Sequence, residues 1–249
     1  MLSVIIITKN EALDILECLE SVAWADEIIV LDSGSEDDTA EICRRYTDKV
    51  FITDWPGYGV QKQRALEKAN GDWILSIDAD ERITPELRKE IGQVMVDNAY
   101  DGYLLPRLSS YCGQFMKHGG WYPDYVLRLF RREKGRFSLE LVHESVMLEG
   151  RVGKLNGLIL HNSYSDLEEV VTKVNSYSSL NAQKLFERGK KSSLSKAIFH
   201  ALWKFINTYF IKLGFLDGRR GLMLAVSSAE GVYYKYVKLL LLNEHSATK

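Results

Sequence analysis

The sequence predicts an α/β protein with a mostly parallel central sheet, followed by a helical, basic and amphipathic C-terminal extension. Two observations predict this fold. Over roughly the first hundred residues, short β-rich runs alternate with helical patterns, which is typical of βαβ units that build a parallel sheet. After residue 165 the apolar residues recur at helical spacing almost to the end of the chain.

The elements of the sheet region follow from these patterns. Strands are expected at residues 2–8, 27–31, 49–52 and 73–77, and helices at residues 12–22, 39–46 and 60–69. A further helix is expected after Thr84, which can cap it ahead of Pro85. Because open α/β sheets bind ligands beyond the carboxyl ends of their strands, the polar loops that follow the strands are the expected site.

The composition is that of a globular protein. The chain has 249 residues, 46% hydrophobic and 27% charged, which is enough for one α/β domain with an appendage. The three cysteines, Cys18, Cys43 and Cys112, lack the CxxC spacing of zinc sites and indicate buried thiols in a reducing compartment. No basic segment and apolar leader precede the first strand, so the expected location is cytoplasmic.

Two carboxylates, Asp78 and Asp80, follow the fourth expected strand. Their spacing of two residues directs them to the same side. Hard oxygen ligands of this kind suit Mg²⁺ or Mn²⁺, and a metal there would neutralise charge on a leaving diphosphate. The alternative is that the two acids cap the following helix and contact water.

Four motifs, in order along the chain, resemble the family-2 glycosyltransferases of the GT-A fold, which is Rossmann-like. They are Ser3-Val4-Ile5-Ile6-Ile7-Thr8-Lys9-Asn10-Glu11, Val30-Leu31-Asp32-Ser33-Gly34-Ser35, residues 59–64, and Asn70-Gly71-Asp72 leading into Asp78-Ala79-Asp80. The resemblance implies an enzyme that uses a nucleotide sugar. It places the catalytic domain at residues 1–165, with the donor-nucleotide half at 1–100 and the acceptor half at 101–165.

The same resemblance implies roles for individual residues. Those expected at the donor nucleotide are Thr8, Asn10, Glu11, Asp32, Lys62, Arg64, Asp78 and Ala79. Asp32 would accept the imide N–H of uracil, and Asp78 would lie near the ribose. Asp80 would bind the divalent metal, and His161 resembles a downstream histidine that some GT-A enzymes use there. A plain turn at Asp32 and a hydrogen-bonded core histidine at His161 are the structural alternatives.

The middle of the chain extends the resemblance to a narrower group. Residues 117–124, 128–131 and 142–144 are similar to bacterial lipopolysaccharide inner-core β-1,4-glucosyltransferases. This implies inverting transfer of glucose from UDP-glucose to a heptose acceptor by single displacement. Such a reaction needs a base for the acceptor hydroxyl. Glu144 is the first choice for this base and Asp124 is the alternative.

Residues 166–249 form the expected helical region, with helices at 166–188, 194–213 and 219–242. Residues 184–242 carry 11 Lys and Arg against 3 Asp and Glu, which indicates an anionic partner surface. In the second helix, Ile198, Leu202 and Phe205 belong to one apolar face, with Lys196 and Lys204 opposite. This pattern favours peripheral attachment to the inner face of the cytoplasmic membrane over nucleic acid binding. Attachment to the membrane surface would also suit a lipid-linked acceptor.

Two other functions fit parts of the sequence. A haloacid-dehalogenase-type phosphatase also uses Asp-x-Asp at a strand end, but Arg82 stands where that class usually has Thr or Val. A catalytically silent, membrane-associated nucleotide-binding scaffold would keep the fold without the reaction. The presence of every key acid argues against the scaffold.

Overall fold

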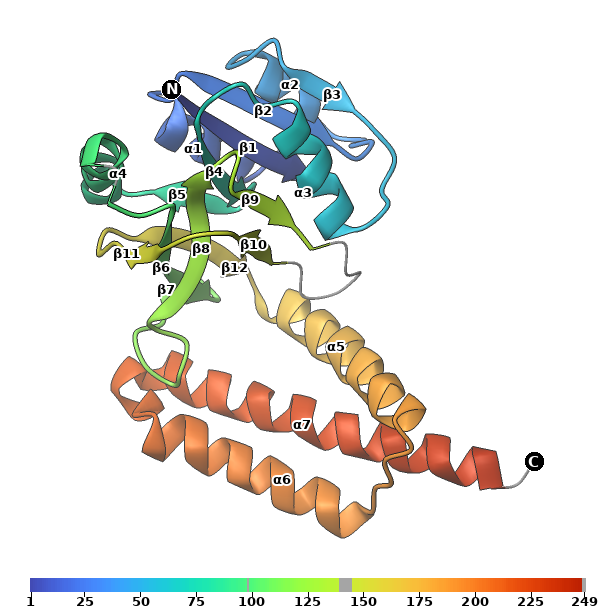
Figure 1. Ribbon diagram of the computed structural model, residues 1–249. Helices are drawn as coiled ribbons and strands as arrows, with labels where there is room; N and C mark the ends of the chain where they lie inside the picture. Colours follow the sequence, from blue (N-terminus) through green and yellow to red (C-terminus); the bar gives the residue numbers. More distant parts are fainter. Residues whose placement is uncertain (98, 139–144, 248–249) are drawn as a thin grey trace. The chain divides into compact units, whose positions relative to one another are not determined.

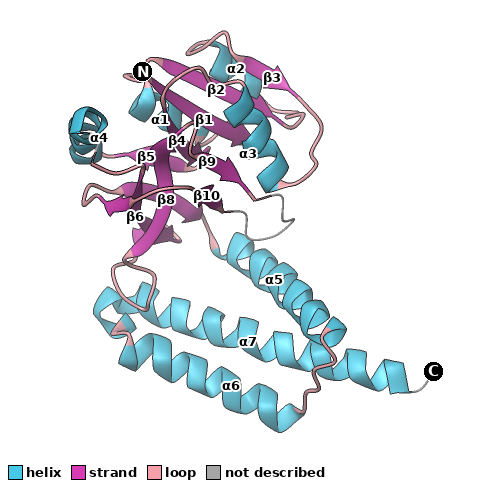
Figure 2. Cartoon of the chain, viewed as in Figure 1, coloured by secondary structure: helices cyan, strands magenta, loops and turns pink. Residues whose placement is uncertain are grey.

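The computed structural model describes residues 1–97, 99–138 and 145–247 (Figure 1). The chain forms two compact units. The first comprises Met1–Arg107 and Asp124–Asn162, and the second comprises Leu108–Pro123 and Ser163–Lys249. The structure therefore groups residues 108–123 with the C-terminal helices. The family resemblance instead places these residues in the acceptor half of the catalytic domain, at 101–165. Figure 2 shows strands and helices in the first unit and mainly helices in the second.

The sheet has a parallel half and an antiparallel half. The parallel strands lie in the order β3-β2-β1-β4, and β8, β6, β12 and β5 continue the sheet. Strand bounds in the parallel half are β1 Leu2–Thr8, β2 Glu27–Asp32, β3 Val50–Ile52 and β4 Trp73–Asp78. The other strands of this sheet are β5 Glu81–Ile83, β6 Gly102–Tyr111, β7 Gln114–Phe115, β8 Asp124–Arg131, β11 Val152–Lys154 and β12 Ile159–Tyr164. Strands β9 Gly135–Phe137 and β10 Val146–Leu148 form a separate pair. The predicted α/β class is confirmed.

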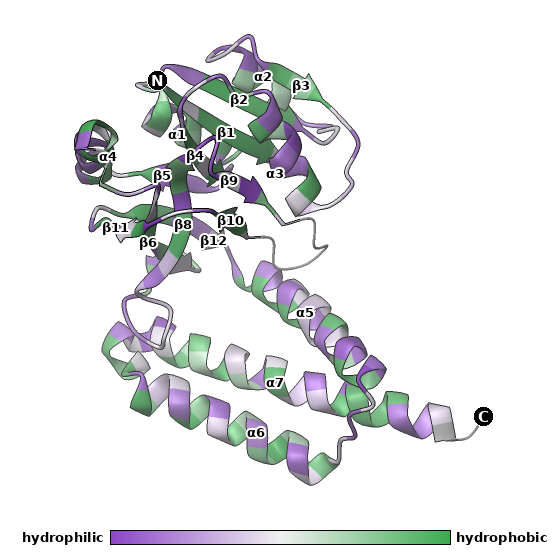
Figure 3. Ribbon diagram, in the orientation of Figure 1, coloured by the Kyte–Doolittle hydropathy of each residue, from purple (hydrophilic) through white to green (hydrophobic). Residues whose placement is uncertain are grey.

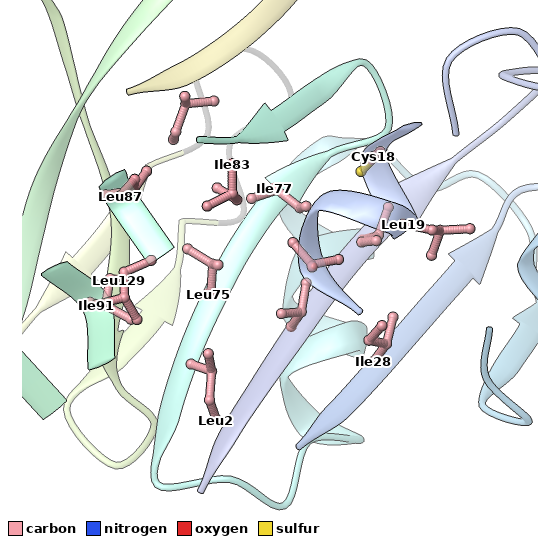
Figure 4. Close-up of a cluster of buried hydrophobic side chains, with 14 of the residues drawn as sticks. Leu2, Cys18, Leu19, Ile28, Leu75, Ile77, Ile83, Leu87, Ile91 and Leu129 are labelled. Atoms are coloured by element: carbon pink, nitrogen blue, oxygen red, sulfur yellow. The ribbon is translucent and has the colours of Figure 1, made fainter. Parts of the chain in front are cut away.

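Alternating residues of the parallel strands enter two separate cores. On one face, Val4, Ile6 and Leu75 pack with Leu19 of α1 and Leu87 of α4, and Figure 4 shows part of this cluster. On the other face, Ile5, Ile7, Ile29 and Ile74 pack against Ala65 and Leu66 of α3. Because both faces are covered, the strands read as continuous apolar runs, and Figure 3 shows them in hydrophobic colours.

The helices of the first unit agree with the patterns that predicted them. They are α1 Ile15–Val22, α2 Thr39–Arg44, α3 Tyr58–Glu67 and α4 Pro85–Asp97. Thr84 caps α4 as expected, since its Oγ1 accepts hydrogen bonds from the backbone N–H groups of Leu87 (3.3 Å) and Leu158 (3.2 Å). The second bond also ties the start of α4 to the segment that leads into β12.

The helices of the second unit are α5 Leu167–Glu187, α6 Leu194–Ile206, the π-helical turn η1 Asn207–Ile211, the 3₁₀ turn η2 Gly214–Asp217 and α7 Gly218–Ala247. Helix α7 packs against both α5 and α6. The helix expected at 194–213 therefore ends as an α-helix at Ile206. The chain reverses tightly after η1, where a Cβ on Gly214 would lie 2.6 Å from the Thr208 carbonyl oxygen and one on Gly221 would lie 1.8 Å from the Gly214 carbonyl oxygen. Only glycine permits these approaches.

Two further expectations concern the cysteines and the membrane. All three cysteines are free; Cys18 and Cys43 are buried, and Cys112 is partly exposed. Burial, with a smaller effect of Asp32, raises the pKa of Cys43 to about 12, so this thiol stays protonated. Within the described residues, no helix combines the length and the apolar character needed to cross a bilayer.

Candidate active site

The carboxyl ends of β1, β2 and β4 meet at one edge of the sheet. In the strand register Thr8 pairs with Asp32, and Ile7 pairs with Asp78. The predicted donor-nucleotide residues from three separate loops therefore come together there. Thr8 is almost fully buried, and its Oγ1 has no hydrogen-bond partner among the described residues. A buried hydroxyl without a hydrogen-bond partner is uncommon, and this one lies at the edge where the three strands end.

The loops after β1 and β2 are joined by hydrogen bonds. The backbone N–H of Asn10 donates to Ser35 Oγ (2.8 Å), and Asn10 Oδ1 accepts from the backbone N–H of Glu36 (2.8 Å). The backbone N–H of Glu11 donates to Thr39 Oγ1 (2.8 Å). Asn10 adopts a positive φ of 55°, which asparagine tolerates better than most residues. The two loops thus form one preorganised wall.

Asp32 holds the turn that follows β2. It is fully buried, and its Oδ1 accepts from the backbone N–H groups of Gly34 (2.9 Å) and Ser35 (2.8 Å). Ser35 Oγ donates to the other carboxylate oxygen at 2.5 Å. Asp32 therefore does stabilise a turn, which was the structural alternative to nucleotide binding. The uracil contact stays a prediction, and it requires Asp32 to accept a further bond beyond these three.

A chain of alternating charges links the donor half to the antiparallel strands. Asp78 accepts from Lys62 Nζ (2.9 Å) at Oδ1 and from Arg128 (2.5 Å) at Oδ2. Arg128 also bonds to Glu81 (2.9 Å), and Arg107 bonds to the same Glu81 oxygen (3.1 Å). Arg107 also donates two hydrogen bonds to Asp124 Oδ2, from Nε (3.0 Å) and from Nη2 (2.7 Å). Three acids and three bases thus compensate one another.

Glu81 and Asp78 are the acids that this network fixes most firmly. The Glu81 side chain is completely buried, and its second oxygen accepts from the backbone N–H of Asp78 (2.9 Å). Burial alone would raise the pKa of Asp78, but the charges and hydrogen bonds of Arg128 and Lys62 outweigh it and hold the pKa well below its usual range. Asp78 is therefore a permanently ionised carboxylate whose oxygens are already occupied by cations.

Asp80 has different surroundings. Its Oδ2 lies 3.2 Å from His161 Nε2, and both side chains are partly exposed. Strand β12 pairs antiparallel with β5, which aligns His161 with Glu81 and brings the histidine beside the Asp78-Ala79-Asp80 turn. The backbone N–H of Asn162 donates to the Asp80 carbonyl oxygen (2.9 Å) and fixes the turn. The two predicted metal ligands are therefore neighbours, although they lie 81 residues apart in sequence.

This pair fits a divalent metal only in part. A carboxylate oxygen and an imidazole nitrogen are suitable ligands for Mn²⁺ and are usable by Mg²⁺. Among residues 1–97, 99–138 and 145–247, no group of three His, Cys, Asp or Glu side chains can hold a metal ion. A metal at Asp80 and His161 would therefore need further oxygen ligands from water and from the diphosphate of a bound nucleotide.

Four other predicted site residues have the following places in the structure. The side chain of Ala79 is buried in the core, so only its backbone can face a nucleotide. Lys62 is buried and points to Asp78, whereas Arg64 forms an ion pair with Asp54 (2.6 Å) at a separate, exposed position. Asp124 is bound to Arg107. Glu144, the first choice for the base, lies outside the described residues.

Sequence reasoning did not identify Arg82 or Glu81 as parts of the site. Arg82 donates to Asp14 (2.8 Å) and Glu17 (2.6 Å), which fastens the β5 strand to α1. Asn162 also donates to Asp14 (2.9 Å). The position of Glu81 directly after Asp-x-Asp was the one sequence feature that could have indicated a role in the site. Its partners, however, come from distant segments.

The acidic and basic side chains lie at the carboxyl ends of the parallel strands, which is where open α/β proteins bind their ligands. The sequence profile described as Glycosyl transferase family 2 matches residues 3–145. The chain is also 33% identical over 255 residues to the lipopolysaccharide core biosynthesis glycosyltransferase LpsC of Rhizobium meliloti, an alignment covering 94% of this chain and 93% of that protein. An uncharacterized glycosyltransferase of Rickettsia typhi is likewise 33% identical over 252 residues, covering 96% of this chain and 86% of that protein.

The chain belongs to glycosyl transferase family 2, and it is a glycosyltransferase of the GT-A fold. Its structure is similar to the crystal structure of S. aureus TarS 1–349 in complex with UDP, with a TM-score of 0.50 and 18% identity over 98% of this chain and 91% of that one. The complex of the same protein with UDP-GlcNAc gives a TM-score of 0.50 at 15% identity, covering 98% of this chain and 92% of that one. At these identities the likeness concerns the fold alone.

Proposed function

We propose that the chain transfers a sugar from a UDP-sugar to a saccharide acceptor with inversion, by a metal-assisted single displacement. Glucose as the sugar and a heptose of the lipopolysaccharide inner core as the acceptor complete the proposal. The observation that supports it best is the Asp80–His161 pair beside an ionised Asp78 at the end of β4. The name of the LpsC relative, which refers to lipopolysaccharide core biosynthesis, supports the acceptor class.

In this proposal the donor nucleotide lies against the joined loops after β1 and β2. Asp32 accepts the uracil imide N–H, and Thr8 Oγ1 and the backbone from Asn10 to Glu11 border the nucleoside. Asp78 faces the ribose and is held in place by Lys62 and Arg128. Lys62 therefore orients the Asp78 carboxylate in this structure.

The metal site is assigned to Asp80 and His161. A divalent cation there supplies positive charge to the diphosphate as it leaves. Since these two side chains alone do not complete a coordination shell, we expect metal and nucleotide to bind with mutual dependence. Asp80 supplies the carboxylate ligand, and the register of β12 against β5 positions the imidazole of His161.

The base that deprotonates the acceptor hydroxyl is assigned to Glu144, with Asp124 as the alternative. Asp124 accepts two hydrogen bonds from Arg107, and this guanidinium also bonds to the buried Glu81. Both bonds from Arg107 fall on Asp124 Oδ2, so this carboxylate oxygen is already occupied and the side chain is tethered to the ion-pair network. For this reason Glu144 is preferred in the proposal.

The test is release of UDP from a panel of UDP-sugars with a heptose-terminated lipid A–core acceptor, in Mn²⁺, in Mg²⁺ and in EDTA. We expect release with UDP-glucose that requires both acceptor and metal. Binding of UDP without release from any donor would instead support the silent scaffold. Phosphate release from a phosphomonoester would support the phosphatase, for which the family assignment offers no support.

We further propose that the second unit attaches to the anionic inner face of the cytoplasmic membrane through α6 and η1. Helix α6 exposes its large apolar side chains, among them Phe199 (67% exposed) and Trp203 (52% exposed). His200 and Lys204 lie toward α7: the rings of His200 and Tyr236 are stacked at 4.6 Å, and Lys204 is half-buried. Lys196 stays exposed, so α6 presents a lysine together with its large apolar side chains. A helix with this orientation suits a bilayer interface.

Flotation with liposomes tests the attachment. Wild-type protein should float with vesicles that contain phosphatidylglycerol, and the double variant Phe199→Ser/Trp203→Ser should remain in solution. Val96→Ser serves as the matched control, because Val96 is 81% exposed on α4 of the first unit. Equal flotation of the double variant and the wild type would contradict the attachment, whereas UDP release with a soluble acceptor should be the same in all three.

A further inference from the structure

A cavity of about 300 Å³ lies within the second unit, between α5 and α7. Its α5 wall includes Val174, Tyr177 and Ser178, and its α7 wall includes Gly231 and Lys235. One end is closed by aromatic side chains from the segment 108–123 and from the end of β12. The glycosyl-transfer residues described above all belong to the first unit, so this cavity is separate from them in the chain.

The cavity exists because α7 has small residues where it faces α5. Ser227, Ser228 and Gly231 line it from successive turns of α7. A Cβ added to Gly231 would have one heavy atom within 4 Å, Val174 Cγ1 at 3.7 Å. Alanine would fit at this position, and glycine inside a helix costs about 1 kcal/mol relative to alanine. The glycine thus keeps space open at a cost to the helix.

The closed end of the cavity is an aromatic cluster. Tyr111 and Trp121 have ring centroids 5.9 Å apart, and the Tyr164 ring lies 5.7 Å from that of Trp121. The Tyr111 hydroxyl lies 2.7 Å from Ser227 Oγ, which fixes the cluster to α7. Tyr177, which is 55% exposed, lies on the α5 wall. Aromatic faces next to hydroxyl groups suit a sugar ring, which has an apolar C–H face and polar edges.

The charge of the cavity is positive. Lys235 lies eight residues along α7 from Ser227, about 12 Å by helical rise. Lys235 is the lysine of the lining, and it is half-buried, which lowers its pKa. In the part of the chain that the structure describes, no carboxylate forms an ion pair with Lys235. A half-buried cation that lacks an acid partner attracts an anion.

We propose that this cavity binds a sugar ring carrying an anionic group, a phosphate or a carboxylate, with the ring against Trp121 and Tyr177 and the anion at Lys235. The ring and the charge are recognised at separate places along α7, so neither feature alone defines the ligand. The identification of this sugar as a non-reacting part of the acceptor rests on the proposed function. Binding itself does not, and it can be measured without any transfer.

Ligand-detected NMR titration of the full-length protein tests this proposal with four probes: mannose 6-phosphate, glucuronate, methyl α-mannoside and inorganic phosphate. We expect the two anionic sugars to bind more tightly than the neutral glycoside and than phosphate. Lys235→Met keeps the apolar stem, and it should weaken the anionic sugars by about tenfold. Its effect on methyl α-mannoside should be small. A stronger response to mannose 6-phosphate or to glucuronate distinguishes the two anions.

Gly231→Leu should fill the cavity and weaken every sugar probe by about tenfold or more, whereas Gly231→Ala should change binding about twofold at most. UDP binding and the urea midpoint show that each variant is folded. Equal binding of sugars by wild type, Gly231→Leu and Lys235→Met would overturn the proposal. So would binding of phosphate as tight as that of mannose 6-phosphate, or binding of an alkyl detergent monomer in preference to all sugars. If a variant loses sugar-phosphate binding but still releases UDP, the result concerns the cavity alone. If the wild type binds sugar phosphates but releases no UDP, the proposed function fails and the cavity proposal stands.

Discussion

The residue pair Asp78 and Asp80 shows how two carboxylates at one turn can differ in role. Asp78 is bonded to Lys62 and Arg128, whereas the side chain of Asp80 contacts His161. Removing charge from Asp78 takes away the ion-pair partner of the buried Lys62 and one of the two acids that bind the buried Arg128. We therefore expect Asp78→Asn to lower the free energy of unfolding by about 3–5 kcal/mol, as measured by urea denaturation.

The matched control for Asp78→Asn is Asp54→Asn. Asp54 also pairs with a cation, Arg64, but its side chain is 74% exposed, so we expect a much smaller loss than for Asp78→Asn. Similar losses in both variants would mean that burial of the Asp78 network contributes little to stability.

Asp80→Asn should affect activity and leave stability nearly unchanged. The side chain is partly exposed and its replacement leaves no buried cation unpaired. If it binds the metal at the diphosphate, its loss should reduce metal-dependent UDP release by about 100-fold or more. The measurement is the initial rate of UDP release at saturating UDP-sugar and varied Mn²⁺. Unchanged rates at every Mn²⁺ concentration would remove Asp80 from the metal site.

At this scale the sequence predicted positions better than partners. Asp78, Asp80 and Asp32 do lie at strand ends, because a polar segment that directly follows a buried apolar strand must leave the core at the end of that strand. Glu81 was not recognised, since a glutamate is rarely buried and its two arginine partners come from β6 and β8, 26 and 47 residues away. The pairing of Lys62 with Asp78 depends on the packing of α3, which periodicity does not specify.

At the scale of elements, Glu27 fastens the amino ends of the central strands. It lies at the start of β2 and bonds to Ser3 of β1, to Lys49, and to Asn70 just before β4. Burial alone would raise the pKa of Glu27, but the bonds from Asn70, Lys49 and Ser3 outweigh it and lower the pKa to about 2. An ionised Glu27 is therefore part of the folded sheet.

This lowered pKa predicts an acid-sensitive sheet. Because the folded-state pKa is below the unfolded value of about 4.3, Glu27 stabilises the fold fully above that pH and progressively less as the pH falls to about 2. The contribution is about 3 kcal/mol. Urea midpoints measured from pH 6 to pH 2 should fall less steeply for Glu27→Gln than for wild type. Parallel pH profiles would contradict the assignment.

Two glycines of the second unit give the next prediction. Gly221→Ala would place a Cβ 1.8 Å from the Gly214 carbonyl oxygen, and this backbone atom cannot move without opening the η1–α7 reversal. We expect a loss of about 1–3 kcal/mol in the free energy of unfolding. Gly231→Ala, with one contact at 3.7 Å, should instead stabilise α7 by up to about 1 kcal/mol. Equal effects in the two variants would show that helix propensity, not the close approach, decides stability.

The sequence predicted the elements of the parallel half, including the short β3 and α2, but it missed β5. Strands β1, β2 and β4 have continuous apolar runs, and α5 has a helical period over 21 residues. Strand β5 has three residues, and its partner β12 follows it by more than seventy residues, so no local pattern indicates it. The end of α6 depends on Gly214 and Gly221 meeting across the reversal, a contact that spacing alone does not predict.

At the scale of the whole molecule, the formal net charge of −2 conceals two oppositely charged units. The second unit has 14 Lys and Arg against 7 Asp and Glu, a net charge of +7, which leaves −9 on the first unit. If the second unit attaches to an anionic bilayer, this separation directs the basic unit to the lipid and keeps the acidic unit from binding it. The exposed apolar side chains of α6 would add an attraction that salt does not weaken.

Salt should therefore weaken the attachment without abolishing it. Screening shortens the range of the lysine–lipid attraction from about 10 Å at 0.1 M salt to about 3 Å at 1 M, whereas burial of Phe199 and Trp203 in the interface is unaffected. We expect flotation with phosphatidylglycerol vesicles to decline with NaCl to a plateau, and the plateau to disappear in Phe199→Ser/Trp203→Ser. Complete release of wild type by salt would mean that electrostatic attraction alone holds the protein, and that the outward apolar face of α6 has another partner.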